Sequence, residues 1–446
     1  MKAHCYVPVA AVTWLLVLLL TGCATVDFAP VLNRSLDDTN IDFSRYRIPS
    51  RRSGDLLLML SFSGGGTRAA AMAYGVLQGL RDSKVPGPGE DRALVDEVDY
   101  ISSVSGGSFT AAYFGLFGRK LFTDFERVFL RKDIEAQVRR RLLSFETLRH
   151  LQSSRYGISD TLAAYYDEHI FQGKSLADLF VAGGPVVDIN AVDISRGTLF
   201  SFSKNQLRII CADPASIPVA RAVAASSAVP VLFSAVALKN NAPECNLPVP
   251  AWIEETLRHP DADPRRTDEA DRIISYLRPG KRRYIHLLDG GLVDNLGVRA
   301  SLARSIAAGG LEQALAQRRM TSTRTIVFIV VDAANWPPVS MDETLEHPPL
   351  ESIISAATSA PLVQYNKETL ALLRRHFNDW EAGDAARRAY LIHLTFDQLP
   401  PGERESMLAM PTSLSLPPDQ VDQVIRAGKN LLFSHPLFQK WIKNDS

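Results

Sequence analysis

The sequence predicts an α/β fold: one open, mostly parallel sheet with helices on both faces. The first observation is an apolar run at 55–63 that ends in glycines and leads into a helix-forming stretch. The second is a β-branched run at 98–104 that ends in Ser105 and two glycines, followed by another helix-forming stretch. The third is a series of later strand-like runs, at 186–194, 284–288, 325–332 and 389–395. Strands that alternate with helices in this way are typical of a parallel sheet covered by helices.

The composition is that of an ordinary globular protein. The chain has 446 residues, 46% of them apolar, which is enough for one large core or two modest ones. Lysine and arginine together number 49, and so do aspartate and glutamate. Because the charges balance, nothing favours a nucleic-acid partner, and none is expected.

The N-terminus has the features of a targeting segment. Lys2 supplies a positive charge, and the uncharged apolar run 7–20 is short for a membrane span. The run continues into Leu20-Thr-Gly-Cys23, which resembles the lipobox of a bacterial lipoprotein. This resemblance implies removal of a signal peptide, 1–22, and a lipid on Cys23, and the following Ala24 implies sorting to the outer membrane. An ordinary secretory signal or an N-terminal anchor helix is the alternative.

Residues 23–53 are polar and irregular, and we interpret them as a lipid-anchored tether. Of the four cysteines, Cys5 lies in the signal and Cys23 would carry the lipid. Cys211 and Cys245 are then a possible pair in an oxidising periplasm. Spacing does not show whether they meet, so the sequence leaves the disulfide open.

The loop after the first strand, Gly64-Gly-Gly-Thr-Arg68, is rich in glycine. Glycines let backbone amides approach a ligand closely, and the N-terminus of the next helix adds partial positive charge. The loop therefore suits an anion or an oxyanion, although a flexible turn without a ligand would have the same sequence. Neither the P-loop pattern nor Gly-x-Gly-x-x-Gly is present.

Ser105 follows the second strand in the segment Tyr100-Ile-Ser-Ser-Val-Ser-Gly-Gly-Ser108. A serine at a sharp strand-to-helix turn presents its hydroxyl at the carboxyl end of a sheet, as in a nucleophile elbow. Only the second half of the usual Gly-x-Ser-x-Gly pattern is present, because Ser103 occupies the first glycine position. Such clusters are also common in plain turns, so the local pattern alone leaves both interpretations open.

The middle of the chain adds further elements. We expect a helix over 121–151, in which Arg139-Arg-Arg141 either attracts anionic headgroups or forms a solvated face. Another helix is expected at 159–170, and the strand at 186–194 returns as a hairpin at 198–203. A helix from 221 ends at Ser226, and the turn after it should pack near the carboxyl edge of the sheet.

The composition changes sharply at 240–281, which we interpret as a surface insertion, either a lid over a site or a plain surface loop. The strand 284–288 then runs into Asp289-Gly-Gly291. An aspartate at the carboxyl end of a strand has the position of acid or base residues in sheet enzymes. The remaining expected elements are a helix, a strand, a helical stretch, a strand and a terminal helix, at 298–308, 325–332, 374–380, 389–395 and 419–443.

Four segments in this order resemble the patatin-like phospholipase family: Gly64-Gly-Gly-Thr-Arg68, Val104-Ser-Gly-Gly107, Ala225-Ser-Ser-Ala-Val-Pro-Val-Leu-Phe233 and Asp289-Gly-Gly291. Asn190-Ala-Val-Asp193 with Ser195-Arg-Gly197 is also similar to the family's Ala-Thr-Asp segment. The resemblance implies a patatin-like catalytic domain at 54–335 that contains the insertion. A C-terminal α/β extension, 336–446, would pack on it.

The resemblance also implies hydrolysis of lipid acyl esters by a dyad, with Ser105 as nucleophile and Asp289 as base. The glycine loop, Gly64, Gly65 and Gly66, would supply the oxyanion hole, chiefly through the amides of the last two. To take a proton from serine, an aspartate must be poorly solvated and close to the hydroxyl. We therefore predict a buried Asp289 within about 3 Å of the Ser105 hydroxyl.

Two further residues of these motifs bear on the site. Arg68 matches the basic residue that ends the family's glycine motif, where it either faces a phosphate headgroup or braces the loop. Ser103 departs from the family, which usually has glycine at this position, where glycine allows close packing of strand and helix.

A Ser-His-Asp triad is the alternative mechanism, with His286, His347, His376 or His393 as the base. His286 and Asp289 are an odd number of residues apart on one strand, so their side chains should point to opposite faces. None of the other three lies in a motif, and we prefer the dyad.

Other functions would fit the same serine. Ser105 determines the acyl-enzyme step and not the acceptor, so lysophospholipase, thioesterase or acyltransferase activity is possible on this fold. A non-catalytic lipid-binding surface lipoprotein is the alternative from another class. No cofactor or metal site is expected, because the metal-binding spacings are absent. The sequence leaves open the physiological substrate, the side of the membrane that the body faces, and the oligomeric state.

Overall fold

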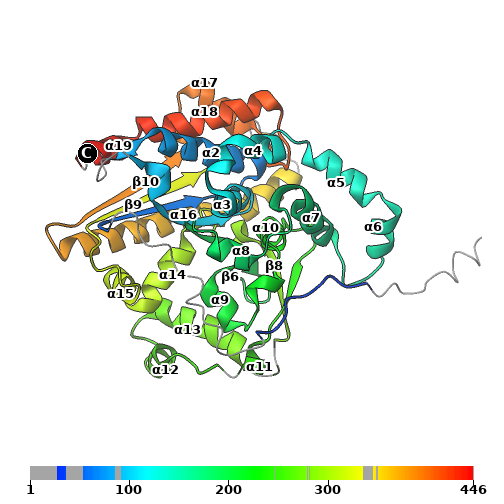
Figure 1. The fold of residues 1–446 in the computed structure, drawn as a ribbon, viewed down its shortest axis with the longest axis horizontal. Helices are drawn as coiled ribbons and strands as arrows, with labels where there is room; N and C mark the ends of the chain where they lie inside the picture. Colours follow the sequence, from blue (N-terminus) through cyan, green and yellow to red (C-terminus); the bar gives the residue numbers. More distant parts are fainter. Residues whose placement is uncertain are drawn as a thin grey trace, which may run out of the picture.

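The computed structural model describes residues 28–36, 54–85, 92–245, 247–278, 280, 282–334, 345–347 and 350–444 (Figure 1). Within them, an eight-stranded sheet has the order β10-β9-β1-β4-β5-β8-β7, and β6 pairs with β5 outside this path. The strands are β1 (Leu56–Phe62), β4 (Val98–Val104), β5 (Val186–Asp193), β6 (Thr198–Ser201), β7 (Val236–Lys239), β8 (Tyr284–Asp289), β9 (Thr325–Asp332) and β10 (Arg388–Thr395). A separate ribbon consists of β2 (Lys84–Val85) and β3 (Arg92–Ala93).

The helices carry the remaining regular structure. In chain order they are α2 (Gly66–Asp82), α3 (Gly106–Phe117), α4 (Leu121–Phe125), α5 (Ile134–Leu142), α6 (Phe145–His150), α7 (Ile158–Tyr166), α8 (Leu176–Val181), α9 (Lys204–Ile209), α10 (Val219–Ser226), α11 (Ala242–Cys245), α12 (Ala251–Arg258), α13 (Pro264–Leu277), α14 (Arg299–Ala308), α15 (Leu311–Gln317), α16 (Leu350–Ala382), α17 (Pro401–Ala409), α18 (Pro418–Ser434) and α19 (Pro436–Asn444). Short 3₁₀ or π turns are η2 (Leu94–Glu97), η3 (Gly118–Lys120), η4 (Glu126–Leu130), η5 (Asp167–Phe171), η6 (Pro214–Ser216), η7 (Gly290–Leu292) and η9 (Phe396–Gln398).

The predicted open, mostly parallel sheet is confirmed. Strands β10, β9, β1, β4 and β5 run parallel to one another. At the other edge, β8 is antiparallel to β5, and β7 is antiparallel to β8. The expected hairpin is also present, since β6 returns antiparallel to β5.

Both faces of the sheet are covered by helices, as predicted. Along β1 the buried side chains alternate between two cores: Leu58 and Leu60 belong to the larger one, and Leu57 to the smaller one. The larger core is shared with α2, α3 and α18. The smaller core is shared with α15 and α16, through side chains such as Leu315 and Phe377. Strands buried on both faces are apolar at most positions, which explains the continuous apolar runs in the sequence.

Three expectations about helices are corrected. The single helix expected over 121–151 is broken, because Asp133 and Ser144 act as N-caps that start α5 and α6. The expected terminal helix is divided at Pro436, which lacks an amide hydrogen and restricts the residue before it. The segment 240–281 is not a plain loop: it contains α11, α12 and α13, and the last two share a small apolar core.

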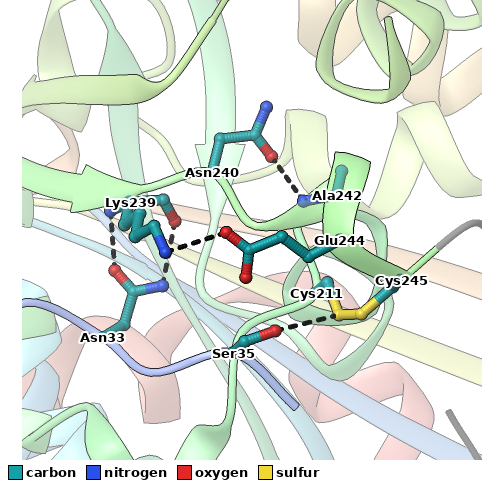
Figure 2. The surroundings of a disulfide bond; sticks show 8 residues. All are labelled: Asn33, Ser35, Cys211, Lys239, Asn240, Ala242, Glu244 and Cys245. Atoms are coloured by element: carbon teal, nitrogen blue, oxygen red, sulfur yellow. Dashed lines mark hydrogen bonds and ion pairs between the residues drawn. A yellow bond between two sulfur atoms is a disulfide. The ribbon is translucent and has the colours of Figure 1, made fainter. Parts of the chain in front are cut away.

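A disulfide joins Cys211 to Cys245, whose Cα atoms are 6.2 Å apart (Figure 2). The pairing that the sequence left open is thus present in the structure. It lies beside the described N-terminal segment, in which Ser35 contacts Cys211 and Asn33 exchanges hydrogen bonds with the backbone of Lys239 (Figure 2). Residues 28–36 therefore lie against the body of the protein.

The other N-terminal predictions lie outside the described residues. These are the signal peptide 1–22, the lipid site Cys23, and the tether before 28 and after 36. Across the described ranges, none of the helices combines the length and apolar character needed to cross a membrane.

Candidate active site

Ser105 lies where β4 ends and α3 begins, at the strand-to-helix turn that the sequence predicts. Its backbone has φ 50° and ψ −122°, which a residue with a side chain adopts only under strain. The next residue must be glycine, because a Cβ atom on Gly106 would lie 2.0 Å from the carbonyl oxygen of Gly66. Only 7% of Ser105 is exposed. The serine is therefore held in one place beside the glycine loop.

The strand register brings Asp289 to the same place. β5 lies between β4 and β8, with Asn190 opposite Val104 on one side and Ala191 opposite Asp289 on the other. This register places Asp289, the last residue of β8, at the level at which β4 ends. The Ser105 hydroxyl donates a hydrogen bond of 2.8 Å to Oδ2 of Asp289. The structure thus brings together the serine and the aspartate that the sequence singled out.

The Asp289 carboxylate is buried without a cation beside it. Its other oxygen, Oδ1, accepts a 2.8 Å hydrogen bond from the amide of Gly291. Among the described residues, no lysine, arginine or histidine forms an ion pair with it. Burial raises the pKa of Asp289 to about 6, and the hydrogen bonds from Gly291 and Ser105 oppose this rise. At neutral pH the group is ionised, yet it is a stronger base than an exposed aspartate.

A raised pKa alone does not identify a base, as Asp294 shows. Burial raises the pKa of this carboxyl to about 6 as well. Its oxygens accept hydrogen bonds from the backbone amides of Val298 and Arg299 at the start of α14. Asp294 therefore caps a helix, and the hydrogen bond to Ser105 is what distinguishes Asp289.

A network of serine hydrogen bonds supports the backbone of the Ser105 turn. The amide of Ser105 donates a 2.9 Å hydrogen bond to the hydroxyl of Ser226, which in turn donates to the carbonyl of Asn190 at 2.6 Å. Ser103 donates to the carbonyl of Asp188 at 3.0 Å. Sequence reasoning gave Ser226 no role, although it stands in one of the family-like segments, and its support of the Ser105 backbone was visible only in the structure.

The three glycines of the loop differ in their amides. The amide of Gly64 donates a 3.0 Å hydrogen bond to the backbone carbonyl of Asn295, so it is occupied. The amides of Gly65 and Gly66 have no hydrogen-bond acceptor in the part of the chain that the structure describes. Both residues have positive φ angles, 137° and 60°, which glycine adopts readily. Two of the three predicted donors are thus available to a ligand.

The structure places Arg68 inside the protein, where it is 1% exposed. Its guanidinium donates hydrogen bonds to the carbonyl oxygens of Ala333 and Met410 and to the hydroxyl of Thr412. Burial lowers the pKa of Arg68 to about 10, and nearby Asp332 opposes this shift. Of the two roles considered, this position fits the bracing of the loop rather than contact with a headgroup.

The C-terminal segment 410–416 lies directly on the glycine loop. The amide of Thr67 donates a 2.8 Å hydrogen bond to the carbonyl of Ser413. A Cβ atom on Gly66 would lie 2.2 Å from that same oxygen. No signal in the sequence linked these two segments, which are far apart along the chain.

The histidines considered for a triad lie elsewhere. His286 is exposed while Asp289, on the same strand, is buried, as the odd spacing predicts. His393 contacts Asp332 at the ends of β10 and β9. Within the described residues, no histidine hydrogen bonds to Ser105 or Asp289.

An exposed apolar turn and a cavity lie near the site. Val231 and Leu232, in the turn after α10, are 102% and 63% exposed, and the nearby carbonyl of Ala228 accepts a hydrogen bond from the amide of Asp289. A cavity of about 1570 Å³ begins at Leu292 and Val293, just past the Asp289 turn, and extends between α13, α14 and α16. Neither Ser105 nor Asp289 lines it, so it is a neighbouring space and not the place where the two residues meet.

The protein is an α/β protein with a serine at a sharp, elbow-like turn between a strand and a helix. This serine is hydrogen-bonded to a buried aspartate and lies beside a glycine loop. The family model of the patatin-like phospholipases matches residues 60–302, more than half of the chain. The chain therefore belongs to the patatin-like phospholipase family.

Solved structures and curated proteins add little to this assignment. The chain is similar to human GIVD cytosolic phospholipase A2, with 12% identity and a TM-score of 0.40 over 89% of this chain and 62% of that one. It is also similar to VipD from Legionella pneumophila, with 12% identity and a TM-score of 0.33 over 88% of this chain and 67% of that one. The chain thus spans less than two thirds of the length of the human enzyme. The comparison with curated proteins gives no match.

Proposed function

We propose that the protein is a serine acyl hydrolase that cleaves acyl esters of membrane lipids or lysolipids through a Ser105–Asp289 dyad. The observation that carries this proposal is the 2.8 Å hydrogen bond from the Ser105 hydroxyl to the buried carboxylate of Asp289. Membership of a phospholipase family supports lipid as the substrate class.

In the first half-reaction, the Ser105 oxygen attacks the carbonyl carbon of the ester while Asp289 takes the hydroxyl proton. Negative charge develops on the carbonyl oxygen, and the amides of Gly65 and Gly66 stabilise it. The amide of Gly106, at the start of α3 and against Gly66, is a third candidate donor. The bond to the alcohol then breaks, the alcohol oxygen takes the proton from Asp289, and the acyl group stays on Ser105.

In the second half-reaction, Asp289 takes a proton from water, and the water oxygen attacks the acyl carbon. The bond to the Ser105 oxygen breaks, the proton returns to that oxygen, and the fatty acid leaves. One carboxylate acts as base and then as acid in each half, which favours a pKa raised toward the working pH. Burial of Asp289 without a cation raises its pKa in this direction, to about 6.

We also propose that the protein is a lipoprotein of the bacterial cell envelope, anchored through Cys23 and located in the outer membrane. The Leu20-Thr-Gly-Cys23 segment supports the anchor, and Ala24 supports the outer-membrane location. The disulfide between Cys211 and Cys245 supports an oxidising compartment. Globomycin, which blocks cleavage of lipoprotein signals, should make the full-length precursor accumulate in cells, and unchanged processing would contradict the anchor.

The test of the enzyme proposal compares the full chain with Ser105→Ala and Asp289→Asn. We expect release of fatty acid from phospholipid and of chromophore from a short acyl ester, and a fall of about 10³-fold or more in both variants. A fluorophosphonate should label Ser105 in the wild type. If no ester is cleaved and Ser105 is not labelled, the enzyme proposal is wrong and lipid binding without turnover takes its place.

A further inference from the structure

Helices α5 and α6 project from the body of the molecule (Figure 1) and carry apolar side chains that are not buried. Leu143 is 69% exposed, Phe145 83% and Leu148 48%. Phe145 and Leu148 are three residues apart in α6, so they share a face of the helix. Leu143 lies just before this helix. Apolar side chains gathered on a projection are a mark of an interaction surface.

In the same projection, the four arginines of α5 and α6 outnumber their two glutamates, Glu135 and Glu146. Arg139 and Arg140 of α5 and Arg149 of α6 are exposed. None of the three pairs with a carboxylate in the described part of the chain, whereas Arg141 forms an ion pair with Glu168 at 2.9 Å. The chain as a whole has a net charge of zero. Unpaired arginines beside exposed apolar side chains are the combination that binds to an anionic lipid surface.

The first described residues of the N-terminal segment are docked on α6. The ring of Phe28 stacks on His150 with centroids 3.6 Å apart, and it meets the edge of Tyr156 at 5.1 Å. The Ser153 hydroxyl donates a hydrogen bond to the carbonyl of Phe28. Cys23 precedes Phe28 by five residues, a reach of at most about 17 Å. A lipid on Cys23 would therefore hold α6 close to the membrane surface.

The projection is also connected to the glycine loop. The amide of Glu135, in the first turn of α5, donates to the hydroxyl of Ser415 at 3.1 Å, and its carboxylate accepts from the amide of Leu414 at 2.9 Å. The neighbouring Ser413 carbonyl accepts the amide of Thr67, in the glycine loop, at 2.8 Å. The segment 413–415 thus links α5 to the glycine loop.

We propose that one face of this projection docks on the anionic surface of a lipid bilayer and orients the active site toward it. This α5–α6 face consists of Arg139, Arg140, Leu143, Phe145, Leu148 and Arg149. The apolar side chains enter between the headgroups, and the arginines contact lipid phosphates. The proposal rests on the proposed function for the Cys23 anchor, whereas the exposure and charge of the face are independent of it.

The test reads the environment of single side chains and needs no turnover. The full chain, with Ser105→Ala so that the lipid is not consumed, is bound to vesicles of phosphatidylethanolamine and phosphatidylglycerol. A polarity-sensitive nitrobenzoxadiazole label is placed on Phe145→Cys. The matched chain carries it on Val181→Cys, which is 58% exposed and is the last residue of α8, outside the α5–α6 face. We expect a blue shift and quenching by lipid-borne spin label for Phe145→Cys but not for Val181→Cys.

The charge of the face is tested with Arg139→Glu combined with Arg140→Glu. This pair should abolish the blue shift, as should vesicles of phosphatidylcholine alone. Arg196→Glu with Arg208→Glu, also exposed but remote from α6, is the matched control and should leave the shift unchanged. Failure to sediment with the vesicles, or a label at Phe145→Cys as exposed to water as at Val181→Cys, overturns the proposal. If the wild type does not hydrolyse lipid, that result contradicts the proposed dyad and not the proposed docking.

Discussion

Two buried aspartates on neighbouring strands, Asp188 of β5 and Asp289 of β8, are held in opposite ways. Asp188 forms an ion pair with Arg304 and accepts a 2.8 Å hydrogen bond from the hydroxyl of Tyr100. Among the described residues, Asp289 has only the Ser105 hydroxyl and the Gly291 amide as side-chain partners. Both residues are buried: Asp188 is 2% exposed and Asp289 is 7% exposed. The compensated carboxylate holds the sheet to α14, and the uncompensated one lies in the candidate active site.

This difference fits the proposed role of Asp289 as a base. An ionised carboxylate inside a protein is costly unless a cation and hydrogen bonds compensate it. A structural carboxylate is compensated in full, as Asp188 is. A base must instead bind a proton with moderate affinity, so a cation beside it would work against its function.

The largest effect is expected from Asp289→Asn, which removes the base but keeps the shape of the side chain. Activity should fall by about 10³-fold to 10⁴-fold, because the serine proton loses its acceptor. The free energy of unfolding, in contrast, should rise. The folded-state pKa of about 6 lies above the unfolded value of 3.8, so the ionised carboxylate destabilises the fold at pH 8 and the uncharged amide does not.

The stability gain of Asp289→Asn should approach about 3 kcal/mol at neutral to alkaline pH. The sign follows from the raised pKa: the cost of ionisation is full above about pH 6 and vanishes below about pH 4, where the carboxyl is protonated in both states. Urea unfolding of both chains at several pH values measures it. If the two chains have the same free energy of unfolding at every pH, burial does not raise the pKa of Asp289.

The counterpart of this substitution is Arg304→Met, which removes the cation from Asp188. The carboxylate would remain buried with Tyr100 as its partner, and the free energy of unfolding should fall by about 3 kcal/mol. The matched control is Arg324→Met, since Arg324 pairs with Asp384 on the surface and should contribute less than about 1 kcal/mol. If both substitutions cost the same, the comparison of compensated and uncompensated aspartates fails.

Sequence patterns predicted the part of the fold that depends on local signals. The apolar runs and the glycines after them predicted β1, β4, α2 and α3, because burial and sharp turns each restrict residue choice locally. Strand β7 has only four residues and no glycine or proline turn signal of its own, so it was missed. Helices α12 and α13 were not predicted, because the sequence around His259-Pro-Asp is polar. Several of the apolar residues of these helices are only partly buried in the small core that the helices share.

The site could be predicted where its residues stand in motifs. Ser105, Asp289 and the glycine loop were found in this way, and the register of β4, β5 and β8 explains why they meet. The occupied amide of Gly64 could not be predicted, because its acceptor, Asn295, belongs to a distant turn. The contact of 410–416 with the glycine loop is likewise long-range, and such contacts leave no periodic or compositional signal.

The pH dependence of activity tests the same contrast on a smaller scale. Only ionised Asp289 can accept the serine proton, so kcat/KM should rise with pH through about 6, falling about tenfold per pH unit on the acid side. Asp294→Asn is the control, because burial raises the pKa of Asp294 similarly, but its oxygens accept hydrogen bonds from the backbone amides of Val298 and Arg299. If the inflection disappears in the Asp294→Asn enzyme, the titrating group is Asp294 and not Asp289.

The smallest effect is expected from Ser103→Gly, which restores the residue that the family usually has. The Ser103 hydroxyl donates to the carbonyl of Asp188 at 3.0 Å and accepts from Ser108 at 3.1 Å. Ser108 keeps a second partner, the hydroxyl of Ser226 at 3.0 Å. Losing these bonds and gaining backbone freedom should destabilise the protein by about 1 to 2 kcal/mol. Because Ser103 does not touch Asp289, kcat/KM should change by less than about threefold.

Ser103→Ala separates the two contributions, since it removes the hydroxyl but keeps the Cβ atom. If the hydrogen bonds dominate, alanine and glycine should destabilise the protein almost equally in thermal unfolding. If backbone freedom dominates, glycine should cost more. A gain in activity of tenfold or more in either variant would mean that Ser103 restrains the Ser105 turn, so that the uncompensated Asp289 would not be the only feature of this region that limits the reaction.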